Sequence, residues 1–265
     1  MPFIKNGFLG QEAKSIAAKI RTDYKEYFLI ADRVNEFTNG IVSTILVNPD
    51  NPHDCLIHNL VAKIIHSFNS VIILTQYGLE SDCNTLLRSL LESLFIFQAI
   101  YKDESLGFKY IQSEIIKQFK TANVILGDEN ISKYYNEKQI ANIKMQKESL
   151  KQEINDKGIK AFSIEEWSKK ADLHDVYQTA YRVFSKDVHS EPVAIECFLN
   201  LDDNKKLKSI RLGPSVNEIK RNLCTASGVM LAVTESICEF KKINKTEEID
   251  ILKENLKILD KRFSN

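Results

Sequence analysis

Residues 80–101 constrain the fold of this 265-residue chain more than any other segment, because they are apolar on nearly every side of a helix. The apolar positions are Leu86, Leu87, Leu90, Leu91, Leu94, Phe95 and Phe97. A helix that is apolar all round is stable when other elements surround it. We therefore expect this helix at the centre of a helical bundle.

The rest of the chain also has the spacing of apolar residues that is typical of helices. Only nine glycines and five prolines occur, which favours long helices over a strand-and-turn architecture. Residues 200–213 are the least helical, and we expect a loop or a small hairpin there. The expected helices span about 11–47, 53–77, 80–101, 104–127, 136–156, 173–189, 214–242 and a last segment that ends near 263, with a short one beginning at Ser163.

The segment 136–156 is much more charged than its neighbours, and its thin apolar stripe is interrupted by Lys147. This composition predicts a helix that projects from the bundle. We therefore predict an all-α fold, a single multi-helix bundle with a projecting charged helical hairpin arm. It would form one domain over 1–265, with core helices at about 11–127 and 163–265 and the arm at about 128–158.

Charge and cysteine content exclude several classes of protein. Lys+Arg and Asp+Glu both number 36, so nucleic-acid binding would need a local basic patch. The five cysteines are odd in number and form no CxxC pair, which indicates buried thiols in a reducing cytoplasm. The histidines lack metal-ligand spacing and no phosphate-binding glycine loop occurs, so we expect neither a metal nor a cofactor.

We expect no membrane segment and a cytoplasmic location. The N-terminus lacks the continuous apolar stretch of a signal peptide. The two most apolar windows, 60–77 and 86–101, are interrupted by polar and charged residues, among them Lys63 in the first and Arg88 in the second.

Arg88 and Glu92 are the first candidate functional pair, since they lie four residues apart in the most apolar helix. A buried charge is costly unless it is paired. The two side chains therefore either form a structural ion pair or line a polar cleft inside the bundle. Asp187 is expected on the apolar side of its own helix, where Arg88 would be a natural partner.

Arg182 and His189 are the second candidate pair. They are seven positions apart, so in an α-helix they would lie about 20° apart on one face, two turns distant. Arginine binds phosphate and histidine transfers protons near neutral pH. Ser185 shares this face and Tyr181 flanks it, although an ordinary solvated helix face would also explain the pattern.

Two resemblances follow from these residues. The order Leu-Leu-Arg88-Ser-Leu-Leu-Glu92, then Trp167, then Tyr181-Arg182-x-x-Ser185-x-x-x-His189 resembles an uncharacterised bacterial all-helical family over about 60–200. This resemblance implies a fold and no established activity.

Arg182 and His189, with six residues between them, also resemble the Arg-x4–6-His motif of the HEPN superfamily. Many members are metal-independent ribonucleases that act as toxins or anti-phage effectors, and dimerisation brings two motifs into one cleft. The resemblance implies that His189 transfers the proton and that Arg182 holds the phosphate. Val183 stands directly after the arginine, where active members often have a polar residue.

The expected function is thus a HEPN-like ribonuclease effector in anti-phage defence or growth control. Its partners would be RNA, an antitoxin or regulatory protein, and a second copy in a homodimer. One alternative is a non-catalytic interaction module in which Arg88, Glu92, Asp187 and His189 form a structural network. Another is a nucleotide-binding regulator with a closed pocket at Arg88 and Arg182. The alternatives differ in whether Arg182 and His189 are exposed in a cleft or buried.

Overall fold

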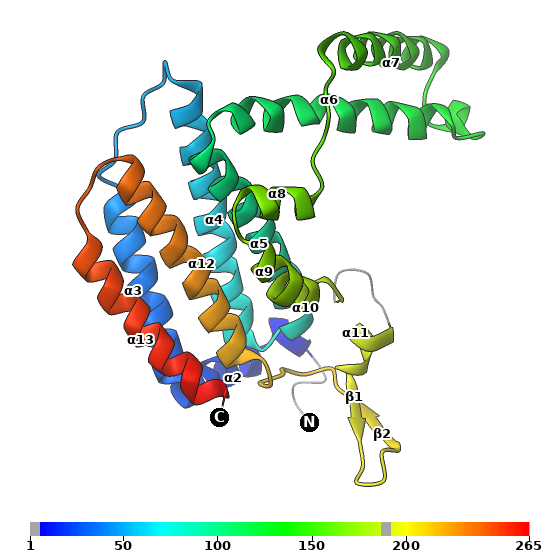
Figure 1. The fold of residues 1–265 in the computed structure, drawn as a ribbon. Helices are drawn as coiled ribbons and strands as arrows, with labels where there is room; N and C mark the ends of the chain where they lie inside the picture. Colours follow the sequence, from blue (N-terminus) through cyan, green and yellow to red (C-terminus); the bar gives the residue numbers. More distant parts are fainter. Residues whose placement is uncertain (1–5, 187–191, 265) are drawn as a thin grey trace.

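The computed structural model describes residues 6–186 and 192–264, and it is mostly helical (Figure 1). The bundle contains α2 (Gln11–Asp23), α3 (Lys25–Val42), α4 (Pro52–Tyr77), α5 (Glu80–Lys102), α12 (Ile219–Phe240) and α13 (Thr246–Ser264). The other helical segments are η1 (Gly7–Leu9), α6 (Ser105–Leu126), η2 (Ile131–Lys133), α7 (Glu137–Lys157), α8 (Ile164–Lys170), α9 (His174–Val176), η3 (Tyr177–Tyr181), α10 (Arg182–Ser185) and α11 (Pro192–Glu196). The predicted all-α class is confirmed.

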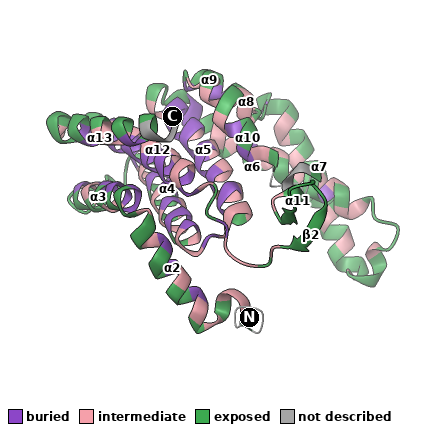
Figure 2. Ribbon diagram, turned by 90° about the horizontal axis from the view of Figure 1, so that it is seen from below, coloured by how far each residue is buried: buried purple, intermediate pink, exposed green. Residues whose placement is uncertain are grey.

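Helix α5 lies at the centre of the bundle, as its all-round apolar sequence predicts. It packs against α4 and α12, and against α8 and α10. Leu87, Leu90, Phe95 and Phe97 have no appreciable solvent exposure. Figure 2 shows buried residues concentrated along α4, α5 and α12. Burying each of these large apolar side chains contributes about 1.5–3 kcal/mol.

Both ends of α4 are specified by local sequence. The Asn51 side chain accepts hydrogen bonds from the amides of His53 and Asp54, and Pro52 occupies the first turn, where its missing N–H costs nothing. Gly78 ends the helix in the left-handed region, at φ 69°. A Cβ on Gly78 would lie 2.6 Å from Pro214 Cβ, so both the dihedral and the close approach require glycine.

The expected helix 11–47 is wrong in two respects, because the helix ends at Val42 and the chain breaks at Tyr24. This residue has φ −111° and ψ 28°, and it separates α2 from α3. Helix α2 packs on α4, whereas α3 packs mainly on α12, so tertiary contacts redirect the chain. No glycine or proline lies near Tyr24 to signal the break.

The projecting arm consists of α6 and α7, which lie side by side away from the bundle (Figure 1). Helix α7 has no buried residue, in keeping with its charged sequence. Periodicity assigned residues 104–127 to the core, but the structure differs. Leu106 and Gly107 pack against the bundle at the start of α6, and its outer part pairs with α7.

The short strands β1 (Leu199–Leu201) and β2 (Leu207–Ile210) form an exposed antiparallel hairpin, where the sequence indicated a loop or small hairpin. Among the described residues, α4 and α12 are long and apolar enough to cross a membrane by length and composition alone. In the relevant windows 39% of α4 and 67% of α12 is buried inside the fold. Core helices of globular proteins meet the same criterion.

Candidate functional site

Arg88, Glu92 and Tyr181 form a polar cluster where η3 crosses α5. Arg88 Nε donates to the Tyr181 oxygen at 3.0 Å, and the Tyr181 hydroxyl donates to Glu92 Oε1 at 2.8 Å. Arg88 Nε also lies 3.3 Å from Glu92 Oε1. The two expected partners on α5 are therefore an ion pair, and the third member arrives from a segment 89 residues further along the chain.

The Tyr181 hydroxyl uses both its donor and its acceptor capacity within this cluster. Burial raises the pKa of Tyr181; the Arg88 hydrogen bond opposes this rise, and the hydrogen bond to Glu92 and the charge of Glu92 add to it. The phenol stays protonated and keeps donating to Glu92. The Arg88 guanidinium also lies over the Tyr181 ring, 5.3 Å from its centroid.

The backbone that carries Tyr181 is a π-helical turn, η3, between α9 and α10. Such turns insert an extra residue into a helix and often mark functional sites. The expected uniform α-helix over 173–189 is therefore wrong within its described part. Side-chain directions inferred from a regular α-helix do not apply across 177–181. Tyr181 and Phe184 are buried, and Arg182 is exposed on the turn that follows.

A column of rings continues from Tyr181 towards solvent. Tyr177 stacks on Tyr181 with centroids 5.0 Å apart, and His174 stacks on Tyr177 at 5.8 Å. The ring of Phe95 meets both tyrosines edge-on from α5. The column joins the partly buried polar cluster to a partly exposed imidazole.

The remaining predicted site residues have different fates. Ser185 is half-buried, and its hydroxyl donates to the Tyr181 carbonyl oxygen at 2.7 Å, so it closes the helix turn. Asp187 and His189 lie outside the described residues. The expected contact between Arg88 and Asp187 lies outside them as well. Of the predicted site residues, the structure brings Arg88, Glu92 and Tyr181 together. Arg182 directly follows Tyr181 in the chain.

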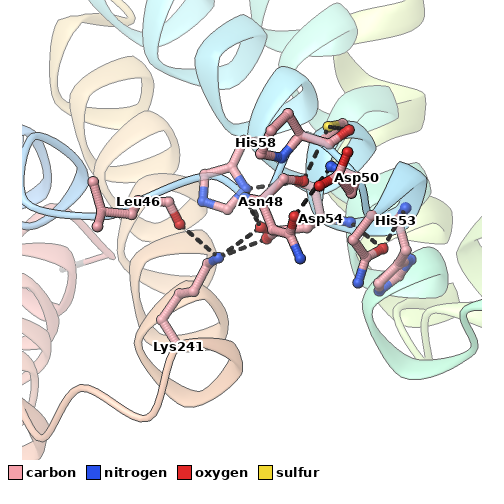
Figure 3. Close-up of polar contacts among 10 residues, drawn as sticks. Leu46, Asn48, Asp50, His53, Asp54, His58 and Lys241 are labelled. Atoms are coloured by element: carbon pink, nitrogen blue, oxygen red, sulfur yellow. Dashed lines mark hydrogen bonds and ion pairs between the residues drawn. The ribbon is translucent and has the colours of Figure 1, made fainter.

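A second polar cluster, centred on Asp54, was not predicted from the sequence (Figure 3). Lys241, just beyond α12, lies 2.7 and 2.9 Å from the two carboxylate oxygens of Asp54. The backbone N–H of Asn48 donates to the Asp54 carboxylate at 2.6 Å, and His58 Nδ1 lies 3.2 Å from the same carboxylate. Lys241 also donates to the Leu46 carbonyl at 3.1 Å, so the cluster fastens the loop before α4 to the end of α12.

Asp54 is almost completely buried, with 3% of its surface exposed. Burial alone would raise its pKa, but the hydrogen bonds from Lys241 and Asn48 and the charges of His58 and Lys241 outweigh burial and lower the pKa. A buried carboxylate that is paired in this way holds elements together. Asn48 and Lys241 are 6 and 187 residues away in sequence, so of its partners only His58, four residues further along α4, had a local spacing that could have indicated a contact.

Side chains that could bind a metal ion do not cluster in the described part of the chain. Within residues 6–186 and 192–264, no group of three or more His, Cys, Asp or Glu side chains is arranged to hold one. Cys83, Cys224 and Cys238 are buried, and burial raises the pKa of the Cys83 thiol to about 11 and that of Cys224 to about 12. These three thiols are packing groups, as expected, whereas Cys55 and Cys197 are only partly buried, unlike the expectation for all five.

Comparison with known proteins gives one match. Searches of curated proteins and of solved structures each returned no significant match. A family model, described as a family of unknown function (DUF5677), matches residues 54–207. The matched segment covers more than half of the chain, and it includes α5, the arm, the ring column and both predicted motif segments. The expected membership of an uncharacterised helical family is thereby confirmed: the chain belongs to the DUF5677 family of unknown function.

Proposed function

We propose that this protein is a HEPN-like, metal-independent ribonuclease that acts as an effector in anti-phage defence or growth control. Arg182 binds the scissile phosphate, and His189 accepts the proton of the ribose 2′-hydroxyl. The 2′-oxygen bonds to phosphorus, and the bond to the 5′-oxygen breaks. That oxygen takes its proton from the imidazolium of the second motif in a homodimer, which leaves a 2′,3′-cyclic phosphate and a 5′-hydroxyl.

The observation that carries the proposal is the exposed position of Arg182 beside a fixed residue. Tyr181 is held by Arg88 and Glu92 through hydrogen bonds of 3.0 and 2.8 Å. Arg182 follows it and is exposed, as is Lys186 one turn later. The backbone that carries Arg182 is therefore held in place, which limits where its guanidinium can reach, and positioning is a large part of phosphodiester catalysis. An interaction module would not need Arg182 at the surface.

The proposal has further parts that concern its surroundings. The enzyme acts in the cytoplasm on RNA, and a second copy supplies the other half of the cleft. An antitoxin or another regulatory protein keeps it inactive until a signal arrives. The zero net charge agrees with a nuclease that makes a few local phosphate contacts and does not bind RNA broadly.

The second candidate function is a non-catalytic interaction module or a nucleotide-binding regulator. One observation favours it: Arg88, Glu92 and Tyr181 satisfy one another, so the cluster performs a structural role without any ligand. In this function the network positions α9, η3 and α10 for a partner, and RNA remains intact.

The test is expression of the full chain with total RNA examined in parallel. Wild type is compared with Arg182→Ala and His189→Ala, and the matched controls are Arg33→Ala and His66→Ala, which replace exposed residues on α3 and α4. We expect growth arrest and RNA with cyclic phosphate ends for the wild type and both controls. Either motif substitution abolishes both effects while the circular dichroism spectrum is unchanged.

Purified protein is then incubated with RNA in a chelator, which separates metal-independent cleavage from nuclease contamination. If the purified protein leaves RNA intact, the ribonuclease is contradicted and the interaction module is favoured, whether or not expression arrests growth in cells. Cleavage that survives both Arg182→Ala and His189→Ala would show that other residues carry the activity.

A further inference from the structure

We propose that the imidazole of His174 is a stacking platform for a nucleobase of single-stranded RNA, next to the phosphate held by Arg182. This inference rests on the proposed ribonuclease function and names the form of its substrate. Its evidence is a column of three near-parallel rings that ends at a partly exposed histidine.

The column is stiff at its inner end. The planes of Tyr177 and Tyr181 are 19° apart with centroids at 5.0 Å, and those of His174 and Tyr177 are 13° apart at 5.8 Å. Tyr181 is fixed by Arg88 and Glu92, and Phe95 supports both tyrosine rings edge-on from the core helix. A ring that rests on such a column is already held in place when a base arrives, so little entropy is lost on binding.

The π-helical turn aligns His174 with Arg182. The two residues are eight positions apart in the sequence, and in a regular α-helix they would be about 80° apart around the axis. The extra residue in η3 reduces this angle. The surroundings of Glu165 agree with this alignment. Its Oε1 lies 4.0 Å from His174 Nε2. Lys169 lowers the pKa of Glu165 most, and the charges of His174 and Arg182 lower it further. Glu165 is neutralised chiefly by Lys169, at 2.7 Å.

The edges of the His174 ring are held, one face is stacked on Tyr177, and the side chain is still partly exposed. Nε2 lies 3.1 Å from Gln178 Nε2, and Nδ1 lies 3.5 Å from Ser168 Oγ. Tyr177 covers the inner face, and 38% of the His174 side chain is exposed. Among the described residues no aromatic ring covers the outer face. Stacking on such a face tolerates any base, and a base can reach it only when it is unpaired.

The experiment measures binding separately from cleavage. Full-length protein with His189→Ala, which prevents turnover, is titrated into a fluorescein-labelled oligouridylate of ten nucleotides and into an abasic oligomer of the same length and charge. Anisotropy gives the affinity of each. His174→Ala and His174→Phe are compared in this background, with Thr179→Ala, at an exposed position on the same turn, as the matched control.

We expect the intact oligomer to bind about tenfold more tightly than the abasic one. His174→Ala removes this difference, whereas His174→Phe and Thr179→Ala retain it. The salt dependence of binding stays the same in His174→Ala, because stacking releases no counterions. Retention by His174→Phe shows that an aromatic ring is what the site requires, and unchanged affinity of His174→Ala for the abasic oligomer shows that this variant is folded.

Equal affinity of the His174→Ala variant and its parent for the intact oligomer would overturn the platform, and so would an equal loss on both oligomers. The two proposals fail separately. Cleavage by the wild type without any effect of His174→Ala contradicts the platform alone. Base-dependent binding that His174→Ala removes, in a wild type that does not cut RNA, contradicts cleavage alone.

Discussion

The hydroxyl of Tyr181 donates to Glu92 across 2.8 Å and thereby ties the π-helical turn η3 to the central helix α5. Arg88 completes the contact from one helical turn earlier on α5. Arg182 directly follows this anchored tyrosine and begins α10.

Tyr181→Phe tests the contribution of this hydroxyl. The substitution removes both hydrogen bonds and leaves the Arg88–Glu92 ion pair, so we expect the free energy of unfolding to fall by about 1–2 kcal/mol. Urea denaturation followed by circular dichroism measures it. Tyr177→Phe is the matched control in the same column, and we expect it to change stability by less than about 0.5 kcal/mol. Equal effects of the two substitutions would contradict a specific role for the Tyr181 hydroxyl.

Asp54→Asn tests the cluster that fastens α12 to the loop before α4. The amide cannot neutralise Lys241, whose side chain is only 19% exposed, so a largely buried charge is left without its partner. We expect a loss of about 2–4 kcal/mol in the free energy of unfolding. Asp50→Asn, on the exposed turn nearby, is the control and should be close to neutral. A loss below about 0.5 kcal/mol, which is the scatter of surface substitutions, would show that the cluster is dispensable.

The effect of Asp54→Asn depends on pH. The folded-state pKa of Asp54 is lowered, so its carboxylate stabilises the fold above the unfolded pKa, about 3.9. This stabilisation is lost as the pH falls through the folded pKa. The difference in unfolding free energy between wild type and Asp54→Asn should therefore be present at about pH 5 and shrink below about pH 4. A difference that stays unchanged down to about pH 3 would contradict the assignment.

Gly78→Ala tests the turn that joins α4 to α5. The methyl group would be forced into the left-handed region and would meet Pro214 Cβ at 2.6 Å and the Ser215 carbonyl at 2.8 Å. We expect a loss of about 2–4 kcal/mol, measured by chemical denaturation. Gly158→Ala separates the two causes, because Gly158 has φ 57° but no atom within 4 Å of the new methyl group. Its loss should be about 1 kcal/mol.

The local features of the fold could be predicted well from the sequence. The bounds expected for α4, α5 and α7 agree with the structure to within one residue or so at each end, since apolar periodicity and terminal signals act over a few residues. The start of a short helix at Ser163 was also expected, and Ser163 and Glu166 form both hydrogen bonds of a capping box there. The break at Tyr24 and the π-turn at 177–181 were missed, because neither has a glycine or proline to mark it.

The candidate site was predictable only in part. Arg88 and Glu92 could be paired because they lie four residues apart on one helix. Tyr181 was expected nearby, but its hydrogen bonds to both could not be derived, since they join segments about ninety residues apart, separated by the whole arm. In the Asp54 cluster only the spacing of four between Asp54 and His58 was local, and the main partner Lys241 lies 187 residues away.

The sequence by itself determined the helical class, the central place of α5 and the charged arm, because each follows from where apolar side chains recur along a helix. The tertiary structure alone decided which polar groups meet. Burying α5 against η3 takes Arg88 and Glu92 partly out of water, and their charges are then compensated by Tyr181, the donor and acceptor that the packing brings within reach. Periodicity records which face of a helix is buried, and it carries no information on which distant residue packs there.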